Sequence, residues 1–364
     1  MKSVILPIVL LALFLSQCGP QSKTELWEPE ILKDFLANGK DCILPDYSYA
    51  GYGYDGITKP HPIVTTEYDV TDFGAVPNDG VEDSKAIQIA IDNIGKNGGG
   101  ILNFPKGRFL VNMDSNILNN IQINYSNVVL RGSGSDTTGT IIFTGSSTHH
   151  QQDTTPYLSQ FVFHSGLNLF GTDRFYTVDE EPEFARLTAD FKKGESIIAL
   201  KKTEGLKAGE FLIIAMKNTT TDGNLTKELM NPLDFEPFQT SYSEAGKISA
   251  PSFQWMVEIE QVIDEQRVKL KQPSRRDILT KFDAFVVNVP MLKNIGVENM
   301  RFECAYQGGY KHHLSPEHDY GWGAVCLHRV AHGWIKNLHI HNYTQTTHLV
   351  NSRNVSISDI TITG

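Results

Sequence analysis

Two adjoining stretches carry the strongest pattern in the sequence: VTDFGAVPNDGVEDSKAIQIAIDNI over residues 70–94 and GGGILNFPKGRFLV over residues 98–111. The first begins as a strand, turns at residues 77–80 and continues as a helix for which Asp83 and Ser84 are N-cap candidates. Apolar residues recur in this helix at the spacing of one buried face, at Ala86, Ile87, Ala90, Ile91 and Ile94. Three glycines then return the chain to a second strand. The pattern predicts strand, helix and strand, with one face of the helix packed on the strands.

A second pattern is a repeat near the end of the sequence. Its members recur at an offset of 22 residues, with Ile335, Asn337, Leu338 and Ile340 followed by Ile357, Asp359, Ile360 and Ile362. Asn299, Met300 and Phe302 fit the same template, with about 16 extra residues before the next copy. Such a period suits three short strands and three bends, which is one turn of a β-solenoid. We therefore expect Leu338 to stack on Ile360 in a common core.

Residues 68–111 resemble the N-terminal module of the pectate-lyase superfamily, which includes polygalacturonases, rhamnogalacturonases and β-helical phage tailspikes. The resemblance implies an all-β fold, a right-handed parallel β-helix (solenoid) whose open end is capped by the helix that follows Asp83 and Ser84. It is specific for architecture and silent about chemistry, because the same module precedes lyases, hydrolases and adhesion proteins.

The chain divides into five parts in this interpretation. Between two groups of coils the period changes, and longer alternating strands joined by polar loops indicate a β-rich insertion on the solenoid. A solenoid needs a cap at each end, and none follows the last coil, so we expect the protein to continue beyond residue 364. The parts are a signal peptide (1–17), a tether with a short helix at 29–37 and a Tyr- and Gly-rich loop packed on the body (18–67), an N-terminal β-helix module (68–145), the β-rich insertion (146–290, strands at 196–200, 210–215, 255–262 and 267–270) and further coils (291–364).

The first residues predict export. Lys2 precedes an apolar run over residues 4–15, which is too short to span a bilayer and has the length of a signal-peptide core. The run ends in Leu15-Ser16-Gln17-Cys18, which resembles the lipobox of bacterial lipoproteins and implies lipidation of Cys18. Gln17 departs from the small residue common before that cysteine, and the alternative is a plain secretory signal. We expect a cell-surface or periplasmic lipoprotein, otherwise a secreted protein, that meets a membrane only through its lipid anchor.

Charge and cysteine content exclude some partners and leave others open. The formal net charge of −10 argues against nucleic acid, because nothing neutralises phosphates in bulk. Export permits one disulfide among Cys42, Cys304 and Cys326, and the sequence does not choose the pair. No cysteine spacing typical of a metal site is present.

Histidines are concentrated late in the chain, between residues 301 and 354. Eight of the twelve fall there, at positions His312, His313, His318, His328, His332, His339, His341 and His348. The same region is mildly basic in an otherwise acidic protein and holds several Tyr and Trp residues. Aromatic faces stack on sugar rings, and imidazoles and cations suit carboxylate or sulfate groups. The predicted partner is therefore an anionic polysaccharide.

The leading hypothesis is a polysaccharide lyase that cleaves a uronic or sulfated glycan by β-elimination. This reaction needs a base, a cation that stabilises the developing charge, and an acid for the leaving oxygen. Arg301 or Lys336 is the expected cation. The remaining candidates are His312, His313, His318 and Tyr320 for acid and base, and Asp319, Trp322, His339 and His341 for substrate binding. The competing interpretation of the 312–322 segment is a surface loop held by its own Asp/His hydrogen bonds.

The geometry of a strand motivates a groove at this site. His339 and His341 alternate with the inward Leu338 and Ile340, so both leave the core on one face. We expect the insertion at 306–322 to overhang a groove whose floor includes these two histidines. A metal held by them with His318 or Asp319 is a less favoured alternative, so no cofactor is predicted. Ca²⁺ is possible in this fold, but no site for it is visible.

Two further function classes stay open at this point. A glycoside hydrolase on the same scaffold is the runner-up, although the Asn-Thr-Asp, Asp-Asp and Gly-His-Gly motifs of polygalacturonases are absent from this sequence. The acidic cluster of calcium-dependent pectate lyases is also not visible. A non-catalytic glycan-binding or adhesion solenoid is the third possibility, and a product assay on polysaccharides separates the three.

Overall fold

The structure, a computed structural model, describes most of the chain in two units, residues 1–46 and 47–364. The predicted signal peptide, Cys18, Cys42, His313 and Tyr320 lie outside the described residues. Among the helices that are described, none combines the length and apolar character needed to cross a membrane. The described ranges are 27–39, 49–54, 63–115, 120–148, 159–165, 182–230, 251–312, 314–315, 318–319 and 321–364.

The described part of the first unit is the helix α2 (Glu30–Asn38), which confirms the helix predicted at 29–37. It ends at Gly39, which has a φ of 53°. A positive φ is easy for glycine, so this residue is a suitable helix stop. The apolar side of α2 is exposed, with Leu36 at 68%.

The second unit opens with the predicted capping module. Strand β1 (Glu67–Asp69) and a 3₁₀ turn, η3 (Val70–Phe73), lead to the helix α3 (Ser84–Lys96). The apolar face of α3 is buried against the first coil, with Ile87 and Ile91 fully buried, as predicted. Asp83 occupies the N-cap position, as predicted, but its side chain makes no capping bond to the helix. Its carboxylate accepts backbone N–H groups of Val76 and Leu110, both at 2.9 Å, and so ties the turn before the helix to a strand of the first coil.

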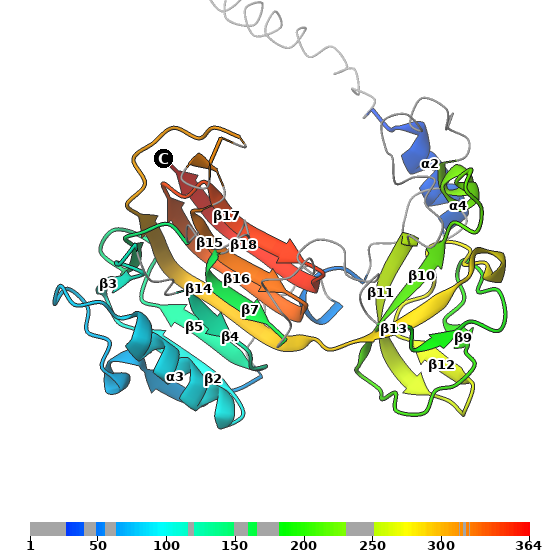
Figure 1. Ribbon diagram of the computed structural model, residues 1–364, viewed down its shortest axis with the longest axis horizontal. Helices are drawn as coiled ribbons and strands as arrows, with labels where there is room; N and C mark the ends of the chain where they lie inside the picture. The colour runs from blue at the N-terminus through cyan, green and yellow to red at the C-terminus, as the bar shows by residue number, and fades with distance from the viewer. Residues whose placement is uncertain are drawn as a thin grey trace, which may run out of the picture. The chain divides into compact units, whose positions relative to one another are not determined.

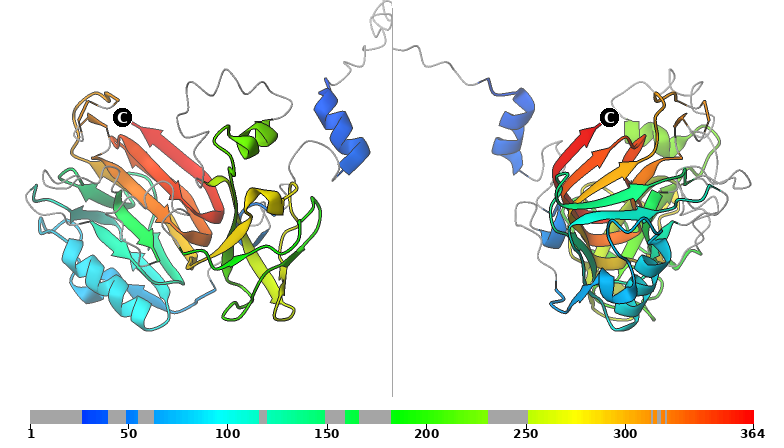
Figure 2. Two further views of the ribbon diagram at one scale, coloured as in Figure 1. Left: turned by 45° about the vertical axis from the view of Figure 1, so that its right-hand side comes forward. Right: turned by 90° about the vertical axis from the view of Figure 1, so that its left-hand side faces the viewer.

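The coils form a right-handed parallel β-helix with three faces (Figures 1 and 2). Strands β2, β5, β14, β16 and β18 stack on the first face, β3, β6 and the second halves of β14, β16 and β18 on the second, and β4, β7, β15 and β17 on the third. Both figures show them stacked from α3 towards β18. Their bounds are β2 Gly100–Phe104, β3 Gly107–Val111, β4 Ile121–Ile123, β5 Val128–Gly132, β6 Thr140–Thr144, β7 Ser159–His164, β14 Leu292–Cys304, β15 Gly323–His328, β16 Val330–His341, β17 Gln345–Val350 and β18 Arg353–Thr363.

The bend between the first two faces explains the Asn and Asp positions of the repeat. Asn299, Asn337 and Asp359 have φ values of 59°, 49° and 57°, in the left-handed region that Asn and Asp tolerate better than most residues. Two of these residues are also bonded to each other across adjacent coils, since Asn337 Nδ2 donates to Asn299 Oδ1 at 2.9 Å. Each long strand can therefore turn a corner and serve two faces.

The repeat argument is confirmed by the register. Leu338 lies opposite Ile360, and Met300 lies opposite Leu338, in adjacent parallel strands. Leu338 and Ile340 are buried in the central core, and Ile360 packs against it. The extra residues of the first copy form the loop between β14 and β15, residues 305–322, at the corner between the second and third faces.

The inserted sheet is antiparallel and has its own core. The strands run in the order β8-β13-β10-β11-β12-β9, and the four strands predicted in this region are all present. The predicted range of 146–290 also includes β7, which pairs with β4 and β15 on the third face, so the solenoid continues past residue 146. The elements are β8 Ala185–Arg186, β9 Ile197–Ala199, β10 Phe211–Lys217, α4 Asn224–Met230, β11 Pro251–Val262, β12 Arg267–Leu270, η5 Thr280–Phe282 and β13 Phe285–Val289.

A polar joint connects the inserted sheet to the coils and to the segment at 49–54, which contains the turn η2 (Tyr52–Tyr54). Glu258 of β11 accepts hydrogen bonds from the Tyr54 hydroxyl and from His332 Nε2, the latter at 3.2 Å. Burial alone would raise the pKa of Glu258, but the bonds from His332 and Tyr54 hold it below its ordinary value. Arg353 of β18 donates to Met256 O, also on β11. The 49–54 segment is thus packed on the body, as predicted for the Tyr- and Gly-rich loop at 44–52, whose residues 44–48 lie outside the described ranges.

The two described cysteines are both free. Cys304 lies at the end of β14 and Cys326 on β15, and both are buried. Burial raises the pKa of each thiol to about 12, so both stay protonated at neutral pH. The two therefore do not form a disulfide with each other.

Candidate functional site

A row of polar side chains crosses the outer surface of the second face. We call it the outer row and define it as Arg108 of β3, Arg301 and Glu303 of β14, His339 and His341 of β16, and Thr363 of β18. The strand period of two explains it, because Phe302 and Ile340 point into the core and their neighbours point out. The register places Arg301 beside His339 and Glu303 beside His341, and His341 beside Thr363. Coils that are distant in sequence therefore bring these groups together.

Glu303 joins two guanidinium groups in the outer row. Its Oε1 accepts from Arg301 Nε at 2.5 Å, and its Oε2 accepts from Arg108 Nη2 at 3.1 Å. The guanidinium of Arg108 also lies 4.0 Å from the centre of the Phe143 ring. The three charged groups sum to one positive charge, in a protein whose formal net charge is −10.

Arg301 continues the row towards the histidines. Its Nη1 lies 2.6 Å from His339 Nδ1. His339 Nε2 and His341 Nδ1 each lie 2.8 Å from the same oxygen, Thr363 Oγ1. The two imidazole rings are 6.5 Å apart at an angle of 82°. Arg301, His339 and His341, which were predicted to approach one ligand, are thus joined by direct contacts and by Thr363.

Exposure divides the row into supporting and accessible groups. The Arg301 side chain is only 7% exposed, whereas that of Arg108 is 41% exposed. Arg301 was predicted as the charge-neutralising cation, but its burial and its bonds assign it the task of holding Glu303 and His339. Burial, followed by the positive charge of Arg301, lowers the pKa of His339 below its ordinary value, so this imidazole is neutral at pH 7.

Lys336 lies on the first face, around the bend from the outer row. The register places it between Glu298 and Ser358. Glu298 accepts from Arg131 Nε at 2.6 Å and from Trp334 Nε1 at 2.9 Å, so its carboxylate is occupied by neighbours in adjacent coils. Lys336 is half-buried and adds a cation to the outer surface of β16.

The loop at 305–322 holds the second group of candidates through short-range bonds. The Tyr310 hydroxyl pairs with His312 Nδ1 at 2.9 Å, and Ser315 Oγ pairs with His318 Nδ1 at 2.7 Å. His312 Nδ1 also lies 3.5 Å from a carboxylate oxygen of Asp319. These contacts match the competing interpretation of a loop held by its own polar side chains, and they leave the His312 side chain 68% exposed.

Two loop residues differ from the roles expected for them. Trp322 is 6% exposed and packs against Tyr306 with ring centres 5.7 Å apart, so a sugar cannot stack on it in this conformation. Asp319 is 2% exposed, and its carbonyl accepts from Thr344 Oγ1. Both residues therefore pack the base of the loop.

The position of the loop relative to the outer row determines whether a groove exists. Its base is tied to strand ends, since Ala305 N donates to Thr144 O at 2.9 Å and Thr148 N donates to Gly321 O at 2.7 Å. The bonds of the outer row run among its own members. An overhang of the loop above His339 and His341 stays a prediction.

Side chains that the sequence analysis did not select complete the site. Arg108, Glu303 and Thr363 alternate outward on their strands, which a period-two pattern shows, but their neighbours come from other coils. Thr363 could have been found from the 22-residue repeat, because it follows the same spacing as His341. Arg108 could not, because 195 residues separate it from Glu303.

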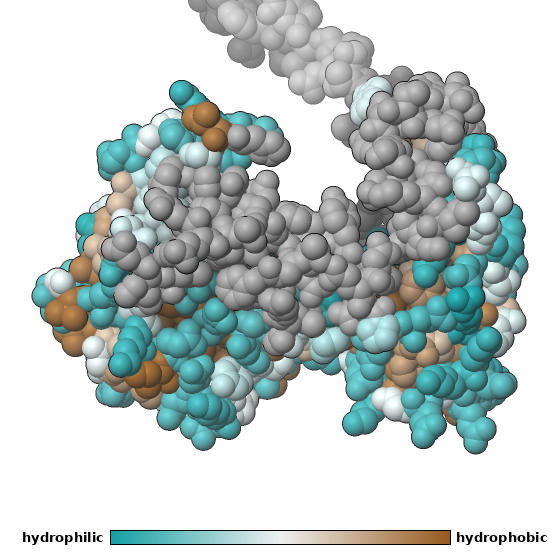
Figure 3. Space-filling model, in the orientation of Figure 1, coloured by the Kyte–Doolittle hydropathy of each residue, from teal (hydrophilic) through white to brown (hydrophobic). Residues whose placement is uncertain are grey.

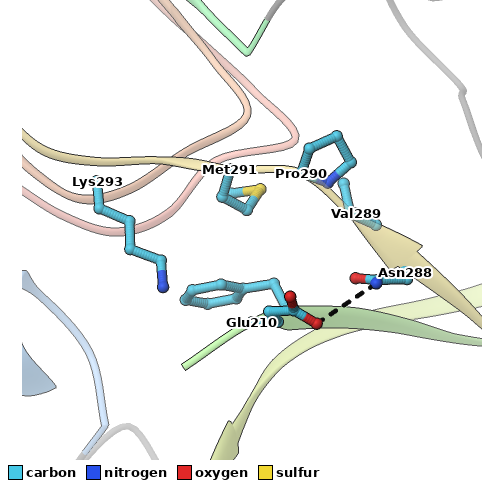
Figure 4. A pocket seen from close by; sticks show the side chains of 7 residues that line it. Glu210, Asn288, Val289, Pro290, Met291 and Lys293 are labelled. Atoms are coloured by element: carbon cyan, nitrogen blue, oxygen red, sulfur yellow. Dashed lines mark hydrogen bonds between the residues drawn. The ribbon is translucent and has the colours of Figure 1, made fainter. Parts of the chain in front are cut away.

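A separate hollow of about 340 Å³ lies where β13 continues into β14 (Figure 4). Figure 4 shows Glu210 bonded to Asn288 on one side and the Lys293 side chain on the other. Lys293 Nζ lies 5.5 Å from the centre of the Phe211 ring. Lys293 Nζ donates to Gly209 O, and Phe211 is fully buried. These side chains hold the inserted sheet on the coil, and we assign the hollow to this joint.

The described surface is mainly polar and offers no metal site. On the face drawn in Figure 3, hydrophilic residues cover most of the described surface, with smaller hydrophobic areas between them. Within the described ranges, no three His, Cys, Asp or Glu side chains are grouped so as to hold a metal ion. The outer row is therefore the strongest candidate for a ligand-binding surface.

A family model matches part of the chain. Residues 68–226 match the model of the family described as rhamnogalacturonase A/epimerase, pectate lyase-like. No curated protein sequence matches the chain.

Several solved structures are similar to the chain at low sequence identity. The chain is similar to the tailspike of Pseudomonas phage phi297 at 10% identity and a TM-score of 0.41, over 82% of this chain and 49% of the tailspike. It is similar to an iota-carrageenase bound to iota-carrageenan fragments at 15% identity and a TM-score of 0.34, over 83% and 37% of the two chains. It is similar to a family 28 exopolygalacturonase of Yersinia enterocolitica at 11% identity and a TM-score of 0.31, over 81% and 43%. The chain spans about half the length of the tailspike.

Proposed function

We propose that this chain is a pectate-lyase-like β-helix, as the family match over residues 68–226 supports, and that it degrades an acidic polysaccharide on the outer surface of its coils. One observation carries the proposal, namely the outer row with its excess positive charge on an acidic protein. A local positive potential attracts an anionic chain even when the whole protein repels it. The family description, which joins rhamnogalacturonase with pectate-lyase-like proteins, supports the same substrate class.

The reaction that suits these groups is β-elimination on a uronide. A base takes the proton α to the carboxylate, the electron pair forms a C=C bond, and the bond to the leaving oxygen breaks. That oxygen then receives a proton from an acid. Arg108 and Lys336 are the accessible cations near the strands, and His312 and His318 of the loop are the candidate base and acid.

Product analysis tests this proposal. The full chain is incubated with polygalacturonate, alginate, a sulfated galactan and a neutral glucan, and both ultraviolet absorbance and reducing ends are followed. A lyase produces unsaturated uronide and reducing ends together on a uronic substrate. Reducing ends without absorbance would mean a hydrolase, and retention of the acidic glycans without any product would mean a binding or adhesion solenoid. Either result contradicts the lyase.

Export and lipidation belong to the same proposal. The support is the sequence of the first 18 residues, with a basic start, an apolar run and Cys18. Expression of the full chain with labelled palmitate in a bacterium should label the membrane fraction, and Cys18→Ser should remove the label. A wild-type chain that is exported without label would leave only the plain secretory signal.

A further inference from the structure

The direction of the hydrogen bonds in the outer row follows from the chemistry of arginine. A guanidinium only donates, and it stays protonated in proteins. Arg301 Nη1 must therefore donate to His339 Nδ1, 2.6 Å away, so this nitrogen carries a lone pair. The proton of the neutral His339 ring is then on Nε2, which donates to Thr363 Oγ1 at 2.8 Å.

Thr363 extends this chain of hydrogen bonds from His339 to His341. Thr363 Oγ1 already accepts from His339, and its single proton can be directed to His341 Nδ1, 2.8 Å away. A hydroxyl that accepts a bond becomes a better donor, so a chain in which every group accepts and donates is favoured over one with two donors at the same oxygen. The chain then runs from Arg301 through His339 and Thr363 to His341.

The end of this chain lies at the outer surface. Because His341 Nδ1 accepts from Thr363, the ring proton of His341 is on Nε2. Among the described residues, that nitrogen has no hydrogen-bond partner. Glu303, its neighbour on β14, is occupied by Arg301 and Arg108.

We propose that His341 donates from Nε2 to one acidic group of the sugar chain, a carboxylate or a sulfate, and binds it together with the exposed edge of Arg108. Arg301 and Thr363 are positioning residues, since they act on the ligand only through His341. The inference rests on the proposed function for its ligand, but the proton position holds whether or not the chain is an enzyme. This proton position excludes His339 and His341 as the base of β-elimination. The base must then come from the loop.

The proton position can be measured directly. Long-range ¹H–¹⁵N spectra of the labelled full chain at about pH 8, above the ordinary histidine pKa, distinguish the two tautomers, and His339→Gln and His341→Gln assign the signals. We expect both rings in the Nε2–H form, and Thr363→Val should lose this preference at His341. Thr361→Val, on the same strand and facing the same side, is the matched control and should change neither ring. An Nδ1–H form of His341 in the unaltered chain would overturn the inference.

Binding gives the second measurement. Trigalacturonate tests the carboxylate, a sulfated galactan trisaccharide tests the sulfate, and a neutral trisaccharide is the control ligand. We expect Thr363→Val to weaken one or both acidic ligands at least about fivefold, while Thr361→Val and the neutral ligand show no change. Equal affinity of Thr363→Val and the unaltered chain for both acidic ligands would also overturn the inference. If the tautomer and binding results hold and no polysaccharide is degraded, only the proposed lyase activity fails.

Discussion

The outer row and the loop at 305–322 carry similar side chains but hold them in opposite ways. In the row, bonds join strands of different coils, as in Arg108–Glu303, Arg301–His339 and His341–Thr363, which are 195, 38 and 22 positions apart, whereas Arg301 and Glu303 are neighbours on β14. In the loop, the contacts stay within the loop itself, as in Tyr310–His312, Ser315–His318 and His312–Asp319. The position of a row residue is set by the stacking of coils, whereas a loop residue is positioned by its nearest neighbours.

This difference separates two tasks that a glycan-degrading site must perform. Recognition of a charged group needs donors at fixed distances, and the rigid coils supply these. Proton transfer needs groups that can approach the substrate after it has bound, and exposed loop side chains can do this. The following predictions test whether the coils and the loop differ in this way.

The largest effect is expected from a charge placed in the core beneath the row. Ile340 is fully buried between His339 and His341, so Ile340→Asp leaves a carboxylate without a partner and should cost several kcal/mol of the free energy of unfolding. Leu314→Asp in the loop is the matched control, because Leu314 is 56% exposed, and it should change stability little. Urea denaturation measures both. Equal losses would remove the distinction between rigid coil and local loop.

The second effect concerns turnover. His318→Ala and Lys336→Ala should each reduce turnover about 10²-fold or more while the Tm stays nearly unchanged, because one removes a candidate acid or base and the other an accessible cation. His348→Ala, on β17 of the third face, is the control and should leave turnover intact. Initial rates on the substrate found in the product assay measure the turnover of all three variants. Full activity of His318→Ala would take the acid–base role away from this histidine.

Some features of the fold and of the site can be predicted from the sequence, because they depend only on the spacing of residues along the chain. The alternation of residues and the 22-residue repeat predict that His339 and His341 leave the core and that Leu338 stacks on Ile360, as the register shows. The capping helix is predicted in the same way, because its buried face is a local pattern. These features need only the periods of strands, helices and coils.

The remaining features depend on which coils become neighbours, and no local pattern gives that. Arg108 meets Glu303 only because the whole inserted sheet lies between β7 and β14 in sequence and leaves the stacking of β6 on β14 intact. Burial of Arg301 is equally hidden, since alternation predicts an outward side chain and not what surrounds it. The same reason explains Trp322, whose ring is buried by Tyr306.

A smaller effect is expected for the pH dependence of stability. The pKa of His339 in the folded chain is lowered by burial and by Arg301, so the folded state binds fewer protons than the unfolded state near the ordinary value of about 6.5. Stability from this group is present above that pH and is lost as the pH falls through the lowered pKa of the folded state. His339→Gln should flatten the fall in Tm between about pH 7 and pH 5. An unchanged or steeper fall would show that His339 is not the group that titrates.

The smallest effect concerns the joint, where His332 interrupts a column of asparagines. Asn127, Asn294 and Asn354 occupy equivalent bends with φ values of 64°, 57° and 55°, and His332 lies between the last two at 54°. Asn294 Nδ2 donates to Asn127 Oδ1 at 2.8 Å, which shows the bond that asparagines make along the column. The His332 ring instead reaches the inserted sheet at Glu258.

His332→Asn should therefore exchange one contact for another within the coils. The new amide can bond along the column, which offsets the lost contact and keeps the change in stability within about 1 kcal/mol.

The 49–54 segment has no such compensation, because Gly53 N donates to His332 Nδ1 at 3.3 Å and Glu258 loses one of its two donors. Hydrogen exchange at residues 52–54 should become faster while exchange at 333–340 stays the same. Tyr54→Phe, which removes the other donor without touching the column, is the control and should accelerate the same residues. Faster exchange throughout β16 after His332→Asn would mean that the histidine supports the coil itself, and the joint would then be part of the solenoid core.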